Sequence, residues 1–171
     1  MANTHTLIQA LTSISGSTTA SFTNIPQTYT DLLIVLNARA NGYNGSEVYL
    51  KFNDSTTSYA GKFLWKDGAT NALASSTLGI STSIFAGIIT GSQGGSNSYG
   101  SGQIYIYRYT DAVTKYCNAD ITSERTSTSD SWLTMSSGGW SNNAAITKID
   151  IVCSHSFLGT SSAYLYGIKN S

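Results

Sequence analysis

The sequence predicts an all-β protein that folds as an antiparallel β-sandwich. Apolar and polar residues alternate over short runs, which is the period-two pattern of strands with one face on a core. No segment keeps apolar residues at helical spacing over several turns, because glycines and Ser/Thr pairs interrupt every long window. Turn-forming residues separate the runs at intervals of about ten residues, a spacing typical of sandwiches and barrels.

Strands are expected wherever this alternation, or a short apolar run, is bounded by turn residues. In chain order they cover residues 6–10, 19–23, 31–36, 48–52, 61–65, 77–80, 84–89, 103–109, 116–121, 132–136, 148–154 and 163–168. We expect one domain over residues 1–171, since a chain of this length can bury a useful core and contains neither a linker nor an internal repeat.

The run Asp31-Leu-Leu-Ile-Val-Leu36 differs from the others because it is continuously apolar. It predicts a central strand that is covered on both faces, and Pro26 is expected to fix the turn that enters it. Asn41-Gly42 and Asn44-Gly45 then predict a hairpin, because glycine tolerates the positive φ of tight turns. In the strand that follows, Val48, Leu50 and Phe52 share the face expected on the core.

The C-terminal half repeats the alternation. Tyr105, Tyr107 and Tyr109 are expected on one face of a strand, with Ile104 and Ile106 on the other. The two cysteines, Cys117 and Cys153, are in phase with inward apolar residues of two separate strands. We expect two buried free thiols, and the alternative is a disulfide if those strands are neighbours.

Composition excludes several classes of function. Only 11% of the residues are charged, against about 25% in typical domains, and the formal net charge is zero. This balance argues against nucleic-acid binding, which needs a basic stripe to neutralise phosphates. No apolar run reaches the roughly 18 residues of a membrane span. The N-terminus lacks a secretory signal pattern, so synthesis in a cytoplasm is expected.

The sequence shows no catalytic, cofactor-binding or metal-binding constellation, and we predict that the protein is not an enzyme. His5 and His155 stand at opposite ends of the chain, outside any ligand spacing. Ser156 follows His155 directly, and adjacent strand residues point to opposite faces, so the two cannot form a catalytic dyad. Asp54 and Asp67 are expected in Asx turns.

The aromatic residues are therefore the candidates for binding. Tyr105, Tyr107 and Tyr109 would stack on sugar rings if exposed; the alternative is that they pack inside the domain or against another subunit. The glycine- and serine-rich residues 91–102 are expected to form a flexible surface loop, or a partner-binding tip with Tyr99 as its anchor. Trp140 is expected in a turn at the edge of the core.

Three stretches together resemble one family. They are residues 20–39 with Asn24-Ile-Pro-Gln-Thr-Tyr29, residues 50–59, and residues 146–151 followed by Phe157 and the closing Ser162-Ala-Tyr-Leu-Tyr-Gly-Ile168. In pattern, they resemble small structural proteins of tailed phages, which occur as capsid decoration (cement) or head-fibre proteins and as terminal modules of tail fibres. The resemblance covers most of the chain, from about residue 20 to residue 168.

The resemblance implies a jelly-roll-like β-sandwich, a homotrimer, a place on the virion surface and no catalytic residues. The first hypothesis is a capsid decoration or head-fibre protein that binds the major capsid protein or another virion protein. The alternative is a tail-associated module that recognises a host cell-surface glycan through Tyr99 or the face of Tyr105, Tyr107 and Tyr109.

Overall fold

The computed structural model describes residues 4–68, 73–123 and 131–169. Twelve strands follow one another without a helix in these ranges. They are β1 His5–Ile14, β2 Thr19–Phe22, β3 Asp31–Ala38, β4 Gly45–Phe52, β5 Tyr59–Asp67, β6 Ala74–Ser81, β7 Ile84–Thr90, β8 Gly100–Tyr107, β9 Lys115–Ser123, β10 Trp132–Trp140, β11 Ile149–Cys153 and β12 Ser161–Ile168. Each strand expected from the sequence is present.

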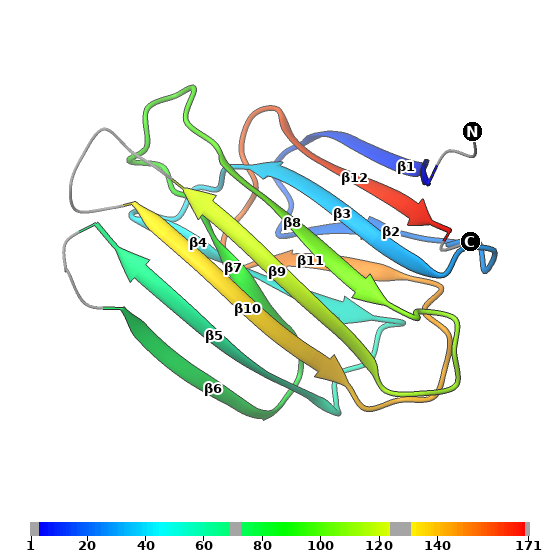
Figure 1. Cartoon of the computed structure of the whole chain (residues 1–171). Coiled ribbons are helices and arrows are strands. Elements are labelled where there is room, and N and C mark those ends of the chain that lie inside the picture. The colour runs from blue at the N-terminus through cyan, green and yellow to red at the C-terminus, as the bar shows by residue number, and fades with distance from the viewer. Residues whose placement is uncertain (1–3, 69–72, 124–130, 170–171) are drawn as a thin grey trace.

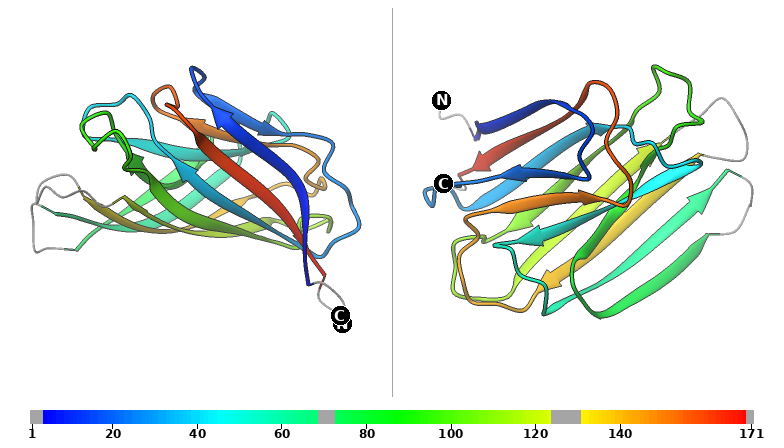
Figure 2. Two further views of the ribbon diagram at one scale, coloured as in Figure 1. Left: turned by 90° about the horizontal axis from the view of Figure 1, so that it is seen from above. Right: turned by 180° about the vertical axis from the view of Figure 1, so that it is seen from behind.

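The strands form two antiparallel sheets that lie face to face (Figures 1 and 2). The larger sheet has eight strands in the order β1-β12-β3-β8-β9-β10-β5-β6, and the smaller sheet has four in the order β2-β11-β4-β7. The predicted antiparallel sandwich is confirmed, while the jelly-roll topology stays a prediction. The first and last strands are neighbours, with His5 paired to Ile168, so both ends of the chain lie at one side of the larger sheet.

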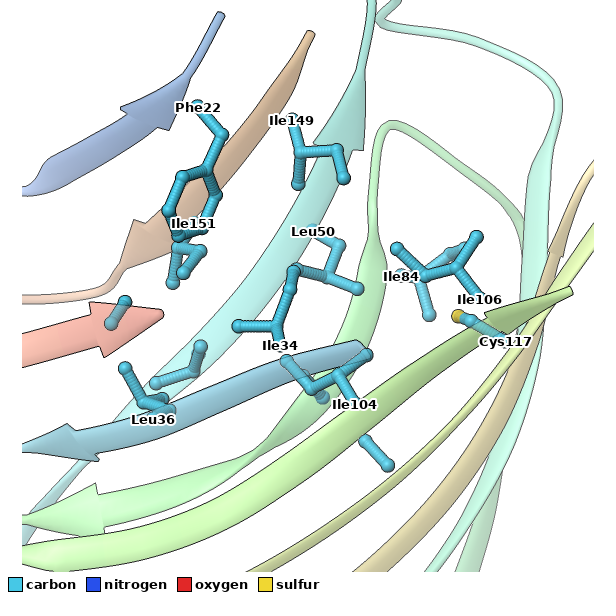
Figure 3. Packing of buried hydrophobic residues seen from close by; sticks show 14 of the residues in the cluster. Phe22, Ile34, Leu36, Leu50, Ile84, Ile104, Ile106, Cys117, Ile149 and Ile151 are labelled. Carbon is cyan, nitrogen blue, oxygen red and sulfur yellow. The ribbon is translucent and has the colours of Figure 1, made fainter. Parts of the chain in front are cut away.

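The core lies between the two sheets and takes the inward residue of each alternating pair (Figure 3). Ile34 of β3 and Ile104 of β8 face Leu50 of β4 and Ile151 of β11, and all four side chains are fully buried. Val48, Leu50 and Phe52 share the buried face of β4, as expected. Burial of these aliphatic side chains stabilises the fold by about 1.5–3 kcal/mol each.

The prediction that residues 31–36 are covered on both faces is wrong. β3 is an interior strand of the larger sheet, but only its Leu32, Ile34 and Leu36 side is buried. Val35 points the other way and is 38% exposed. An unbroken apolar run therefore marks a strand whose second face is open to solvent within the described residues.

The predicted hairpin at residues 41–45 is also wrong. β3 and β4 belong to different sheets, so this segment crosses from one layer to the other. Neither Gly42 nor Gly45 has a positive φ. A Cβ on Gly42 would lie 2.4 Å from the Ser46 hydroxyl oxygen, and one on Gly45 would lie 2.9 Å from the Ile88 side chain. These glycines are needed for close packing rather than for a tight turn.

Both cysteines are buried and free, as predicted. Cys117 lies in β9 of the larger sheet and Cys153 in β11 of the smaller sheet, so the two are not on neighbouring strands. Burial in an apolar environment disfavours the thiolate and raises the pKa of Cys117 to about 12. It raises the pKa of Cys153 for the same reason.

We expect this burial to make the protein sensitive to alkali. The pKa of Cys117 is higher in the folded state than its ordinary value of 9.0, so its stabilising contribution is complete below pH 9.0 and is lost as the pH rises towards about 12. By pH 11 the free energy of unfolding should fall by about 3 kcal/mol from this thiol alone. The raised pKa values of Tyr59 and Tyr109 act in the same direction, and the lowered pKa of Lys115 opposes them.

Urea denaturation of the wild type and of Cys117→Ala, repeated from pH 8 to pH 11, measures this contribution. The wild type should lose more stability over the interval than the variant. Equal losses in both proteins, or a wild-type stability independent of pH, would show that the thiol does not control the alkaline transition.

Candidate functional site

The side of the larger sheet that faces away from the smaller one, here called the outer face, is the candidate functional site. The described residues include ten large hydrophobic side chains that are exposed, and seven of them lie on this face. They are Leu7, Val35, Leu64, Tyr107, Tyr116, Leu133 and Met135. Exposed apolar groups gathered on one face are typical of an interaction surface, whereas single ones are ordinary.

Strand register places the side chains of the outer face in rows across the sheet. One row crosses all eight strands through Leu7, Tyr166, Leu33, Tyr105, Asn118, Ser137, Lys62 and Thr77. The next row runs through Ala10, Tyr164, Val35, Gln103, Asp120, Met135, Leu64 and Ser75. Both rows begin apolar over β1, β12 and β3 and then become mixed, so the face has two halves of different chemistry.

The first half, here called the apolar half, is formed by β1, β12 and β3. It consists of Leu7, Leu33, Val35, Tyr164 and Tyr166. Leu7 is 51% exposed, and the side chains of Leu33, Tyr164 and Tyr166 are half-buried. None of the five carries a charge, so a partner could cover them without desolvating an ion.

Asp31, the acidic residue next to the apolar half, is buried. Asp31, at the start of β3, is 4% exposed. Its two carboxylate oxygens accept hydrogen bonds from the Tyr105 hydroxyl at 2.8 Å and from the Arg108 backbone N–H at 2.7 Å. These bonds satisfy a buried charge and fix the ring of Tyr105 on the outer face.

The second half contains a hollow of about 970 Å³ over β8, β9, β10, β5 and β6. Tyr105 and Tyr107 form one side of it, with ring centroids 4.7 Å apart. The Asn118 amide donates a hydrogen bond of 3.0 Å to the Tyr107 hydroxyl and so orients the second ring. Gln103, Asp120, Lys62, Leu64 and Met135 are among the other lining residues. A concave site with aromatic walls and a few polar groups is the usual form of a ligand site.

The third tyrosine of the predicted stripe is not on this face. Arg108 has φ +48°, which ends the strand alternation after Tyr107. Tyr109 is therefore fully buried, and its hydroxyl donates a hydrogen bond to the backbone carbonyl of Pro26. Of the three, Tyr105 and Tyr107 remain candidates for binding and Tyr109 is a core residue.

Tyr99 also lies outside the hollow. Its side chain is half-buried, and its hydroxyl lies 3.1 Å from the Thr160 hydroxyl in the turn before β12. The loop before it is held by the Arg39 guanidinium, a contact that sequence analysis did not identify. That group donates hydrogen bonds of 2.8–3.3 Å to the carbonyls of Gly91, Ser92, Gly94 and Ser96. The loop is thus fixed by charge-assisted bonds, and Tyr99 is one of its attachments to the domain.

The structure brings His155 close to serines other than the one that follows it. Its Nδ1 lies 3.1 Å from the Ser154 hydroxyl and 3.3 Å from the Ser46 hydroxyl. The neighbouring carboxylate, Glu47, accepts a 2.5 Å hydrogen bond from the Tyr49 hydroxyl instead. Within the described residues, no carboxylate is hydrogen-bonded to the imidazole, so the orienting member of a catalytic triad is not assembled there.

The remaining residues singled out by sequence have structural positions. Asp54 lies in a turn where it and Asn53 both have positive φ, and its carboxylate pairs with Lys148. Asp67 ends β5. Trp140 was expected in a turn, but it is the last residue of β10. It is 1% exposed and packs on Phe52 and Tyr59. The reason is that β10 continues through Gly138 and Gly139 to Trp140.

Neither the scan against models of protein families nor the searches of curated proteins and of solved structures finds a match for this chain. In the three described ranges, no three His, Cys, Asp or Glu side chains are grouped so as to hold a metal ion. The same ranges contain no helix with the length and hydropathy of a membrane span.

Proposed function

We propose that the protein is a non-enzymatic structural protein of a phage virion surface, acting as a capsid decoration or head-fibre protein. In this proposal, the apolar half of the outer face binds a neighbouring virion subunit, such as the major capsid protein. The observation that carries the binding role is the uncharged, uncovered surface of Leu7, Leu33, Val35, Tyr164 and Tyr166. The virion location rests on the resemblance of residues 20–39, residues 50–59, and residues 146–151 with Phe157 and residues 162–168.

The edge of the sheet supports the same role. β1, which carries Leu7 of the apolar half, is an edge strand of the larger sheet, and it is ten residues long. Long edge strands present unpaired backbone groups, and covering them with a partner is one of the ways in which proteins prevent aggregation. A partner that lies on the apolar half would reach this edge as well.

A decoration protein needs no chemistry to act. Contacts that exist only in the assembled shell lower its free energy relative to the ruptured state and so oppose rupture. If the chain forms a homotrimer, three modest contacts combine through avidity. Zero formal net charge favours such close association, because the subunits do not repel one another.

Co-sedimentation tests the proposal. Particles of the encoding phage are prepared from a deletion mutant that lacks this gene, mixed with the purified chain and pelleted through sucrose. We expect the chain to pellet with the particles at a saturating stoichiometry and to raise the temperature at which they release their genome. A chain that stays in the supernatant at tens of micromolar concentration would contradict the virion role.

A further inference from the structure

We propose that the hollow of the outer face binds a neutral oligosaccharide. The hollow lies over β8, β9, β10, β5 and β6, outside the apolar half, so this inference goes beyond the docking proposal and does not depend on it. It rests on the exposure of the aromatic rings, on exposed polar side chains that make no hydrogen bond to the described protein, on the charge balance of the lining and on the shape of the hollow.

Exposed aromatic rings provide stacking surfaces for the C–H faces of sugar rings. Tyr107 is 40% exposed and lies against Tyr105, which Asp31 holds in place. Tyr116, the cross-strand partner of Tyr107, is 60% exposed, and its ring lies over Gly139, where a side chain would crowd it. Rings with one apolar surface and one polar tip suit a ligand that is itself both apolar and hydroxylated.

The floor offers donors and acceptors that the protein does not use. Gln103 and Asp120 are direct cross-strand partners, which places their side chains about 5 Å apart. Within the described residues, the side chains of Gln103, Asp120 and Lys62 make no hydrogen bond to the protein. A carboxylate only accepts, an ammonium only donates, and an amide does both. A sugar hydroxyl also does both, so neighbouring hydroxyls of one ring can satisfy the whole set.

The charge of the lining favours a neutral ligand. Lys62 and Asp120 are the charged residues among those that line the hollow, and their charges cancel. A sulfated or uronic polysaccharide, like a nucleic acid, would need an excess of basic groups to compensate for its own charge. A purely apolar ligand would leave Lys62, Gln103 and Asp120 desolvated without partners.

The shape favours a chain over a single sugar. The volume of about 970 Å³ is at the upper end of the roughly 300–1,000 Å³ found for small-molecule sites. A second hollow of about 440 Å³, which Tyr116 lines, shares Lys62, Thr77 and Ser137 with the first. The two hollows are therefore adjacent, and an oligosaccharide that fills the first can extend toward the second.

The test is a glycan array that carries neutral and anionic oligosaccharides from bacterial and animal surfaces, probed with the fluorescently labelled full chain. The strongest neutral glycan is then titrated calorimetrically into wild type, Tyr107→Ala, Gln103→Ala and Asp120→Asn. We expect binding to at least one neutral glycan and a loss of tenfold or more in affinity in each variant. Tyr43→Ala is the matched control, because Tyr43 is 68% exposed but lies off the outer face, and it should bind as wild type does.

Three results would overturn the inference: no neutral glycan bound above background, binding confined to anionic glycans, or unchanged affinity in both Tyr107→Ala and Gln103→Ala. Both Tyr107→Ala and Gln103→Ala are used so that misfolding of one of them does not decide the test. Thermal melting of each variant shows whether it is folded. Leu7→Asp separates this site from the docking surface, because Leu7 lies on the edge strand β1, three strands from β8, and the variant should keep glycan binding while losing particle binding. Failure on the array with intact co-sedimentation would remove the oligosaccharide site and leave the docking proposal standing.

Discussion

Ile34→Asp should abolish folding. Ile34 is fully buried at the middle of β3, between β12 and β8, and its side chain points into the core between the sheets. A carboxylate there has no partner, and burying it costs several kcal/mol whether it stays ionised or takes up a proton. Domains are stable by only about 5–15 kcal/mol, so the variant is expected in the insoluble fraction without a cooperative melting transition.

The adjacent residue is the control for this substitution. Val35→Asp places the same carboxylate one position further, on the outer face, where it stays hydrated, so this variant should fold and melt cooperatively. Ile34→Val, which removes one methyl group, should cost only about 1 kcal/mol. Circular dichroism of the three variants checks the assignment. A soluble Ile34→Asp protein that melts like Val35→Asp would show that the face assignment of β3 is wrong.

Val35→Asp, although folded, should lose its binding to the virion particle. Val35 lies in the apolar half, paired with Tyr164 of β12 on one side and with Gln103 of β8 on the other, and a charge there would have to be desolvated when a partner covers it. An unpaired charge in a covered interface costs about 2 kcal/mol or more, which corresponds to about 30-fold weaker binding. Co-sedimentation with particles over a range of chain concentrations measures the change.

Val113→Asp is the matched control, because Val113 is the same residue type with 37% exposure, against 38% for Val35, and it lies in the loop before β9 rather than on the outer face. It should bind particles as wild type does. If the two variants weaken binding equally, the effect is one of added charge, and the apolar half is not the docking surface.

Much of the fold could be predicted because alternation is a local property. The inward positions of β4, β9 and β11 follow directly from period two, and so does the burial of Cys117 and Cys153. The prediction of a hairpin at residues 41–45 was wrong because the Asn-Gly pattern indicates a local turn preference and does not indicate which sheet the next strand joins. The prediction that β3 is covered on both faces was wrong for a similar reason, since the composition of the run does not distinguish a covered second face from one that is open to solvent.

The site was predicted in part. Tyr105 and Tyr107 were identified from their spacing, but Tyr109 was assigned to the same face because a backbone reversal at Arg108 leaves no mark in the alternation. Arg39 and Lys115 were missed. The Lys115 ammonium is buried and donates hydrogen bonds to the backbone carbonyls of residues 111, 113 and 142, and such partners have no sequence signature. The rows of the outer face need the strand order, which no local pattern contains.

The outer face combines two surfaces that suit one protein on a particle. The apolar half is uncharged and lies at one edge of the sheet, whereas the hollow has polar as well as apolar lining residues and lies toward the opposite edge strand, β6. A subunit that covers only the first would leave the second open to solvent on the same face of the sheet. Attachment and glycan recognition would then be separate properties, each removable by a substitution that spares the other.

Electron cryomicroscopy of the intact particle tests the central claim, that the apolar half of the outer face is a docking surface, most directly. We expect density for this chain on the particle surface, with Leu7, Val35 and Tyr166 covered by a neighbouring subunit and with the hollow open. A particle without this chain, or one in which the apolar half faces solvent while the smaller sheet makes the contact, would contradict the account.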